Sequence, residues 1–151
     1  MDDHAIYVSL IEAWNSRDAR AFAARFASDA VVIGFDGSLL LGRSVVEQEL
    51  STIFANHPTA PYVATIVELR MLGAGVSGLR ARVGMPTADG SAINPTVNAW
   101  QTMIVTDGLI AQLQTTPAQY HGRPELVEEH SALLAPLLTS DLKVSLSLKD
   151  G

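Results

Sequence analysis

The sequence predicts one α+β domain in which helices pack on one face of a curved antiparallel sheet and enclose an apolar pocket. Two observations lead to this prediction. Apolar residues recur at helical spacing in the first third of the chain, and from Tyr62 onward the period changes from 3.6 to 2, as in strands. The 151 residues and the hydrophobic content of 48% are sufficient for one well-packed core.

Two helices are expected at the N-terminus. The first covers residues 3–16, where apolar side chains lie three or four positions apart: Tyr7, Leu10, Ile11 and Trp14. Asp18 is placed to cap the second helix, which repeats this spacing through Ala19, Phe22, Ala23 and Phe26.

A hairpin and a third helix follow. Residues 30–35 and 39–41 are predicted strands, joined by a primed turn at Asp36 and Gly37. Ser44 and Glu47 have the spacing of a capping box, which predicts a helix that stops before Pro58.

Four antiparallel strands are expected next, separated by short glycine-containing turns: 62–72, 76–85, 96–106 and 109–116. Pro124 suits the first turn of a last helix. Residues 1–138 are therefore expected to form a single domain. The tail, 139–151, is either an edge strand or disordered, and its pattern favours neither.

The composition argues against several classes of protein. A net charge of −6 and a pI near 5.0 argue against nucleic-acid binding. The absence of cysteine excludes disulfide frameworks, thiol nucleophiles and cysteine-based zinc sites. The first residues lack the basic and apolar segments of a secretory signal, and no apolar stretch is long enough to span a bilayer. We therefore expect a cytoplasmic protein with no membrane partner.

Several stretches resemble the SgcJ/EcaC family, within the SnoaL-like part of the nuclear transport factor 2 superfamily. They follow the family's order: Gly-Phe-Asp-Gly-Ser at 34–38, Asn-His-Pro-Thr-Ala-Pro-Tyr at 56–62, Asn-Pro-Thr-Val-Asn-Ala-Trp-Gln-Thr at 94–102, Gln-Thr-Thr-Pro at 114–117 and His-Gly-Arg-Pro-Glu-Leu at 121–126. The resemblance implies a cone-shaped fold with helices on the concave face of the sheet. It also implies a role beside polyketide or enediyne pathways and a homodimer formed through the open face of the sheet.

His57 and His121 are the candidate catalytic residues, because an imidazole can take and give a proton near neutrality. For His57, at the end of the third helix, capping of free carbonyl groups is an equal alternative. The loop position of His121 favours a site role. Glu68 is a weaker candidate for a base, since an exposed position is the favoured alternative.

The candidate ligand-binding residues are apolar or uncharged: Trp14, Phe35, Phe54, Met85, Asn98, Gln114 and Tyr120. Ordinary core packing is the alternative for the aromatic and methionine side chains. Asn98 and Gln114 are suited to fixing a ligand oxygen, but pairing with other amides or across a dimer interface is an equal alternative. Gln101 is assigned to the interface rather than to the pocket.

No cofactor and no metal are expected. The glycines form neither a Walker nor a dinucleotide-binding pattern, and the histidines lack the spacing of metal ligands. This argues against a true oxidoreductase, although the family that the sequence resembles is often labelled so.

The leading hypothesis is a pocket protein of secondary metabolism that binds a hydrophobic small molecule, a polyketide-like or enediyne-precursor intermediate. If it is an enzyme, a cofactor-independent cyclisation, isomerisation or dehydration is expected. The alternative is a non-catalytic carrier or a dimeric partner of another biosynthetic enzyme. Fold-level analogy alone does not choose between these.

Overall fold

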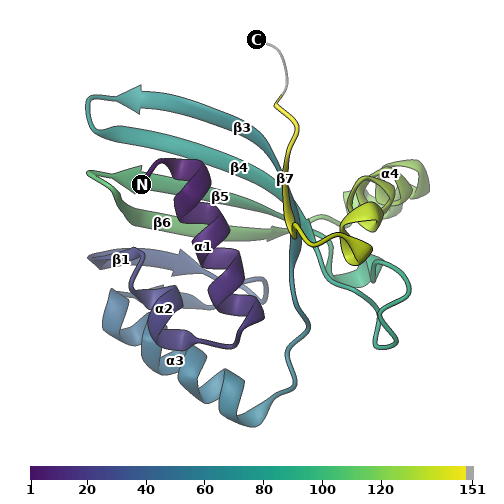
Figure 1. Cartoon of the computed structure of the whole chain (residues 1–151), viewed down its shortest axis with the longest axis horizontal. Coiled ribbons are helices and arrows are strands. Elements are labelled where there is room, and N and C mark those ends of the chain that lie inside the picture. Colours follow the sequence, from purple (N-terminus) through teal and green to yellow (C-terminus); the bar gives the residue numbers. More distant parts are fainter. Residues whose placement is uncertain (149–151) are drawn as a thin grey trace.

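A computed structural model describes residues 1–148, which form one seven-stranded sheet with helices on both sides (Figure 1). The α-helices are α1 (Asp3–Asn15), α2 (Ala19–Ala23), α3 (Arg43–Asn56) and α4 (Pro124–Leu134). The strands are β1 (Phe26–Ile33), β2 (Leu39–Leu41), β3 (Val63–Gly73), β4 (Val76–Gly84), β5 (Ala99–Thr106), β6 (Leu109–Pro117) and β7 (Val144–Leu146). Short 3-10 turns are η1 (Pro95–Val97), η2 (Tyr120–Gly122) and η3 (Ala135–Thr139).

The strand order in the sheet is β2-β1-β6-β5-β4-β3-β7. Strands β3 to β6 form the predicted antiparallel meander. The sheet as a whole is mixed, because β1 pairs in parallel with β6 and β7 pairs in parallel with β3. The tail therefore contributes an edge strand, and its residues 149–151 lie outside the described part of the chain.

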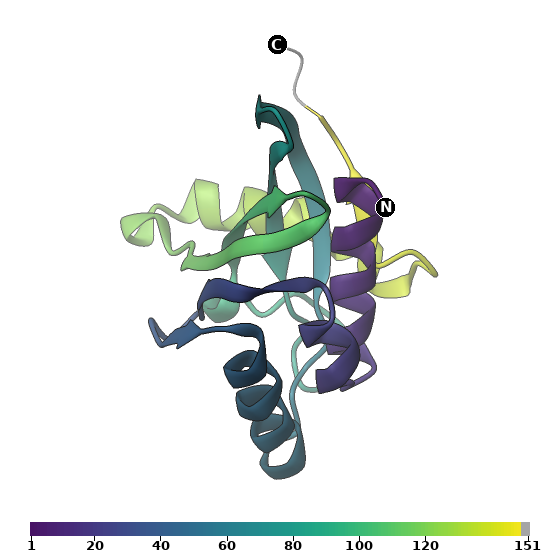
Figure 2. The same cartoon turned by 90° about the vertical axis from the view of Figure 1, so that its left-hand side faces the viewer.

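Helices α1 and α4 lie on opposite sides of the sheet (Figure 2). The helices α1, α2 and α3 contribute to the main core, together with inward side chains of the sheet. Among the largest side chains fully buried in it are Tyr7, Leu10, Phe26, Leu79 and Met103. Helix α4 packs on the other face, where a second, smaller core forms from Val63, Ile93, Leu134 and Leu137. The expectation that the helices share one face holds for α1 to α3 and not for α4.

Three local predictions differ from the structure. Helix α2 ends at Ala23, and Phe26 already starts β1. The capping box at Ser44 does not form, because α3 begins at Arg43 and Gly42 is its N-cap, without a side-chain cap. The turn at Asp36 is not primed, since only Gly37 of the five loop residues has a positive φ, of 87°.

Candidate functional site

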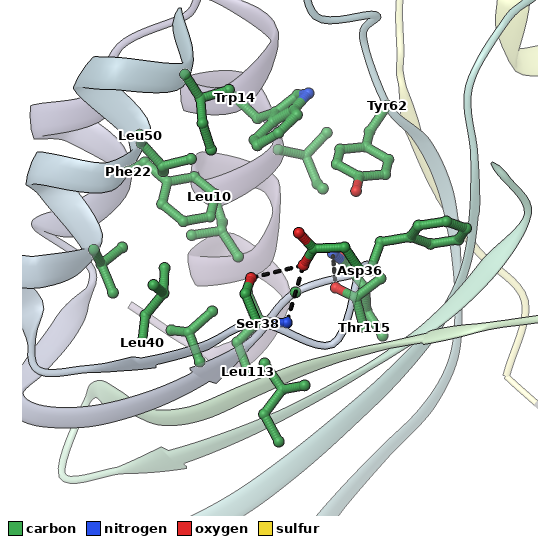
Figure 3. Close-up of a pocket in the computed structure, with 18 residues that line it drawn as sticks. Leu10, Trp14, Phe22, Asp36, Ser38, Leu40, Leu50, Tyr62, Leu113 and Thr115 are labelled. Atoms are coloured by element: carbon green, nitrogen blue, oxygen red, sulfur yellow. Dashed lines mark hydrogen bonds between the residues drawn. The ribbon is translucent and has the colours of Figure 1, made fainter.

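A cavity of about 250 Å³ lies between the helices α1 to α3 and the inner face of the sheet (Figure 3). Most of the residues around it are apolar. From helices α1 to α3 and the segment before β3 come Leu10, Ile11, Trp14, Phe22, Val46, Leu50, Ile53 and Tyr62. From the sheet and the β1–β2 loop come Val32, Ile33, Gly34, Phe35, Asp36, Ser38, Leu40, Gln101, Leu113 and Thr115.

Trp14 is the centre of the aromatic wall of this cavity. Its ring centroid lies 5.2 Å from that of Tyr62, 5.3 Å from Phe54 and 6.3 Å from Phe22. The indole Nε1 donates to the backbone carbonyl of Ala60 at 2.9 Å. Because both its ring and its N–H are held, Trp14 presents a fixed apolar surface to the cavity.

Tyr62 is fixed through its backbone. The side-chain amide of Asn15 accepts from the Tyr62 N–H at 2.7 Å and donates to the Tyr62 carbonyl at 3.0 Å. The phenol is directed into the cavity (Figure 3), and burial raises its pKa to about 12. At neutral pH Tyr62 therefore offers the cavity a neutral hydroxyl.

A chain of hydrogen bonds forms one polar part of the wall. The hydroxyl of Tyr7 donates to Oε1 of Gln101 at 2.6 Å, and Nε2 of Gln101 donates to Oγ1 of Thr115 at 3.2 Å. Tyr7 lies fully in the core, whereas Gln101 and Thr115 also line the cavity. Burial raises the pKa of Tyr7 well above its ordinary range, so this hydroxyl stays protonated.

Asp36 places a carboxylate at the edge of the cavity. Its Oδ1 accepts from the Ser38 hydroxyl at 2.6 Å and from the Ser38 N–H at 3.0 Å. These two hydrogen bonds lower the pKa of Asp36, because both stabilise the ionised form. Within residues 1–148 no hydrogen bond is made to Oδ2, which leaves this oxygen available to a ligand.

Of the residues predicted to bind ligand, the structure places Trp14 and Phe35 at the cavity. Phe54 stands behind Trp14, in contact with the Arg17 guanidinium, whose carbon lies 5.3 Å from the ring centre. Phe54 therefore supports the aromatic wall and does not line the cavity.

Met85, Asn98 and Gln114 lie away from the cavity. Met85 follows β4, and its carbonyl accepts from the N–H of Asn94. Asn98 precedes β5, where its amide donates to the Ser131 hydroxyl of α4 at 3.0 Å. Gln114 alternates with the cavity residues Leu113 and Thr115 and so faces the other side of β6.

The structure does not bring His57 and His121 together at the cavity. His57 is the exposed C-cap of α3, and its carbonyl accepts from the Arg17 guanidinium at 2.8 Å. His121 is exposed in η2, next to Tyr120. The Tyr120 hydroxyl bonds to Nδ1 of His130 at 2.7 Å, on the α4 side of the sheet.

Glu68 points away from the cavity. The β3–β4 register shifts between Ile66 and Glu68, and this irregularity changes the face on which Glu68 lies. Its carboxylate forms an exposed ion pair with Arg80 at 2.7 Å. Glu68 is therefore not placed to abstract a proton from a ligand in this cavity.

Sequence reasoning missed the polar residues of the cavity: Gln101, Thr115, Tyr62 and Asp36. Gln101 was assigned to the interface, but it is only 4% exposed and faces inward between Ala99 and Met103. A signal was present, since alternate positions of this strand are otherwise apolar: Ala99, Met103 and Val105. A lone amide in such a row indicates a buried polar function.

Residues 1–148 contain no group of three or more His, Asp or Glu side chains arranged to hold a metal ion. In the same part of the chain, no helix has the length and apolar character needed to cross a bilayer.

Comparison with known proteins identifies the fold. No protein-family model matches the sequence, and neither does any of the curated proteins. A protein of unknown function with a cystatin-like fold from Nostoc punctiforme superposes with a TM-score of 0.72 at 20% identity, covering 90% of this chain and 94% of that one. An NTF-2-like protein of unknown function from Shewanella oneidensis superposes with a TM-score of 0.57 at 18% identity, covering 75% of this chain and 94% of that one. A ketosteroid isomerase-like protein from Erwinia carotovora superposes with a TM-score of 0.57 at 15% identity, covering 75% of this chain and 91% of that one.

The chain has a nuclear transport factor 2-like fold. This agrees with the cone-shaped SnoaL-like architecture expected from the sequence. In this chain the cavity lies between the helical layer and the concave face of the sheet. The narrower resemblance to the SgcJ/EcaC family stays a prediction.

Proposed function

We propose that this protein binds a hydrophobic small molecule in the cavity beneath α1, α2 and α3. The observation that carries the proposal is the cavity itself, about 250 Å³ and walled by fixed aromatic rings with few polar groups. A concave apolar site with a few convergent polar groups is the usual form of a small-molecule site.

The ligand class we propose is a polyketide-like or enediyne-precursor intermediate of secondary metabolism. The support for this class is the sequence resemblance together with the chemistry of the wall. Such molecules combine apolar rings or chains with oxygen atoms, and the cavity combines an apolar surface with the hydroxyls of Tyr62 and Thr115.

The first test is ligand binding followed by tryptophan fluorescence. Trp14 lines the cavity and Trp100 lies on the other face of the sheet, where Arg82 is 4.8 Å from its ring. Trp100→Phe leaves Trp14 as the single reporter. We expect saturable quenching by members of a panel of linear polyenes and polycyclic aromatic polyketides. No saturable binding of any member would contradict the proposal.

A matched pair of variants locates the binding. Leu113→Phe adds volume to the cavity wall, whereas Ile104→Phe makes a similar change on the outer face of β5. We expect binding to weaken only in Leu113→Phe, with both variants folded by circular dichroism. Equal weakening, or weakening in Ile104→Phe alone, would place the ligand elsewhere.

A second candidate function is acid-base catalysis on the bound molecule, and one observation favours it. Asp36 lines the cavity and its Oδ2 is open to a ligand. A carboxylate facing a carbonyl compound can abstract a neighbouring proton, as a cofactor-independent isomerisation, cyclisation or dehydration requires. The hydrogen bonds from Ser38 lower the pKa of Asp36 and make it a weak base, which favours the carrier.

Mass spectrometry and chromatography of the bound ligand separate the two functions. A carrier returns the ligand unaltered, whereas an enzyme changes its mass or retention. If turnover occurs, Asp36→Asn should abolish it while binding persists. Turnover that survives Asp36→Asn would exclude Asp36 as the base.

A further inference from the structure

We propose that Thr115 is the specificity-determining donor of the cavity, that it selects ligands carrying an acceptor oxygen such as a ketone, and that Tyr7 sets this preference through Gln101. The inference rests on the proposed function, since it concerns the ligand of the same cavity. Tyr7 does not line the cavity and therefore acts as a positioning residue.

The donor-to-acceptor direction of these hydrogen bonds is set at Tyr7. Its hydroxyl lies in the core with 0% exposure, and its only hydrogen-bond partner within residues 1–148 is Gln101, at 2.6 Å. A buried hydroxyl needs an acceptor for its hydrogen. If the amide were reversed, Gln101 would present N–H₂ to Tyr7, and the phenolic hydrogen would have no acceptor. The carbonyl arm of Gln101 must therefore face Tyr7.

The same amide fixes the next step. With Oε1 directed to Tyr7, Nε2 faces Thr115 at 3.2 Å. An amide nitrogen is a donor only, so Oγ1 of Thr115 must act as the acceptor in this hydrogen bond. The hydrogen of the Thr115 hydroxyl is thereby left for another partner.

That hydrogen has no acceptor within the described residues. Thr115 is 7% exposed, lines the cavity, and makes no other side-chain hydrogen bond in residues 1–148. A ligand that fills the cavity excludes water from this group. A ligand with an acceptor oxygen satisfies the hydroxyl, whereas a hydrocarbon of the same shape leaves it unpaired.

Charge narrows the class further. Asp36 is the only carboxylate that lines the cavity in the described residues, and its lowered pKa keeps it ionised at neutral pH. A ligand carboxylate would meet this like charge. The preferred ligand is therefore a largely apolar molecule that has a carbonyl oxygen and carries no negative charge.

Matched small ligands test the inference. The ketone α-tetralone and the hydrocarbon tetralin share one bicyclic skeleton, and their affinities can be measured by titration calorimetry and Trp14 fluorescence. We expect the ketone to bind roughly threefold to tenfold more tightly, the range of one net hydrogen bond. Equal affinity for the two in the wild type would overturn the inference and leave the proposed function intact. Failure of both ligands and of the wider panel would overturn the proposed function.

Variants at Thr115 test whether its hydroxyl causes the ketone preference. Thr115→Val has nearly the same shape without the hydroxyl and should bring the affinity ratio of ketone to hydrocarbon close to one. Thr115→Ser retains the hydroxyl and should restore the preference. Tetralin binding that is not weakened in either variant shows that the cavity is intact. A ketone preference that persists in Thr115→Val would overturn the role of Thr115.

Tyr7→Phe tests the positioning step. Without the phenolic hydrogen, either arm of the Gln101 amide can face Thr115, so the ketone preference should decrease while tetralin binding is retained. A merely structural role would weaken both ligands alike. An unchanged preference in a folded Tyr7→Phe protein would overturn the role of Tyr7.

Discussion

The hydroxyl of Tyr7 in α1 is joined to the amide of Gln101 in β5 by a 2.6 Å hydrogen bond across 94 residues of sequence. Both side chains are buried, and the bond links the first helix to the centre of the sheet. It connects the stability of the core with the wall of the cavity.

Removing this hydroxyl should destabilise the protein. Tyr7→Phe leaves one arm of the buried Gln101 amide without a hydrogen-bond partner, which costs about 1–3 kcal/mol. The matched control is Tyr62→Phe, because the Tyr62 hydroxyl has no hydrogen-bond partner in residues 1–148. Urea unfolding measures both variants. A loss in Tyr62→Phe as large as in Tyr7→Phe would contradict the assignment of this energy to the hydrogen bond.

Gly84 leaves room for α4 to pack on the sheet. A Cβ at Gly84 would lie 2.9 Å from Leu134 and 3.1 Å from Asn98, in the smaller core. Gly84→Ala should therefore destabilise by about 1–3 kcal/mol, as overpacking of a core does. Gly73→Ala, where a Cβ meets no atom within 4 Å, should change stability by less than about 0.5 kcal/mol. Thermal and urea unfolding of the pair measure the difference, and equal effects would argue against this tight packing.

The buried His130 should make stability depend on pH near neutrality. Burial lowers its pKa from the ordinary 6.5, the charge of Arg82 acts in the same direction, and the hydrogen bond to the Val83 carbonyl opposes both. The other groups that face its ring are Tyr120 and Trp100. The unfolded chain binds this proton at higher pH than the folded protein, so the free energy of unfolding falls as the pH drops through 6.5 and levels off below the folded-state pKa.

Unfolding in urea between about pH 8 and pH 5, above most carboxylate titrations, measures this dependence. His130→Gln should remove the decrease. His121→Gln, a change at an exposed residue, should retain it. A decrease of equal size in His130→Gln would show that another group is responsible.

Self-association through the outer face of the sheet is a further expectation, and we propose a homodimer there. Ile104 and Trp100 are half-buried on this face in the single chain and would be covered by a partner. Ile104→Glu should shift the protein to a monomer in sedimentation velocity, because it places a charge at the centre of the face. The control is Leu142→Glu, because Leu142 is 72% exposed and does not lie on β5. This variant should leave the dimer unchanged. A monomeric wild type would contradict the proposal.

The fold was predictable because its periodic segments agree with it. Tyr7, Leu10 and Ile11 are buried on the predicted face of α1, and Asp18 caps α2 as expected, accepting from the Ala21 N–H at 2.9 Å. The four long strands and their turns follow the alternation and the glycines. The spacing of apolar residues and the positions of glycines can be read from neighbouring residues alone, so they predict helices and strands without knowledge of the tertiary structure.

The site was less predictable because its polar residues depend on strand register. Gln101 faces inward because it lies on the same face of β5 as the buried residues Ala99 and Met103. An irregularity in the β3–β4 pairing turns Glu68 outward. The irregularity at Glu68 has no local sequence signature, and one residue of register moves a side chain to the other face. Gln101 was assigned to the wrong face, whereas the exposed position favoured for Glu68 is confirmed.

Both edges of the sheet consist of strands of only three residues, β2 and β7, within the described part of the chain. An unpaired strand edge is a template onto which another chain can add its own backbone, and short edges limit such addition. Strand β7 pairs only with residues 64–66 of β3, so beyond Ile66 the outer edge of β3 has no neighbouring strand within the described residues. An added strand would therefore find its longest run of free backbone partners on β3, not on β2 or β7.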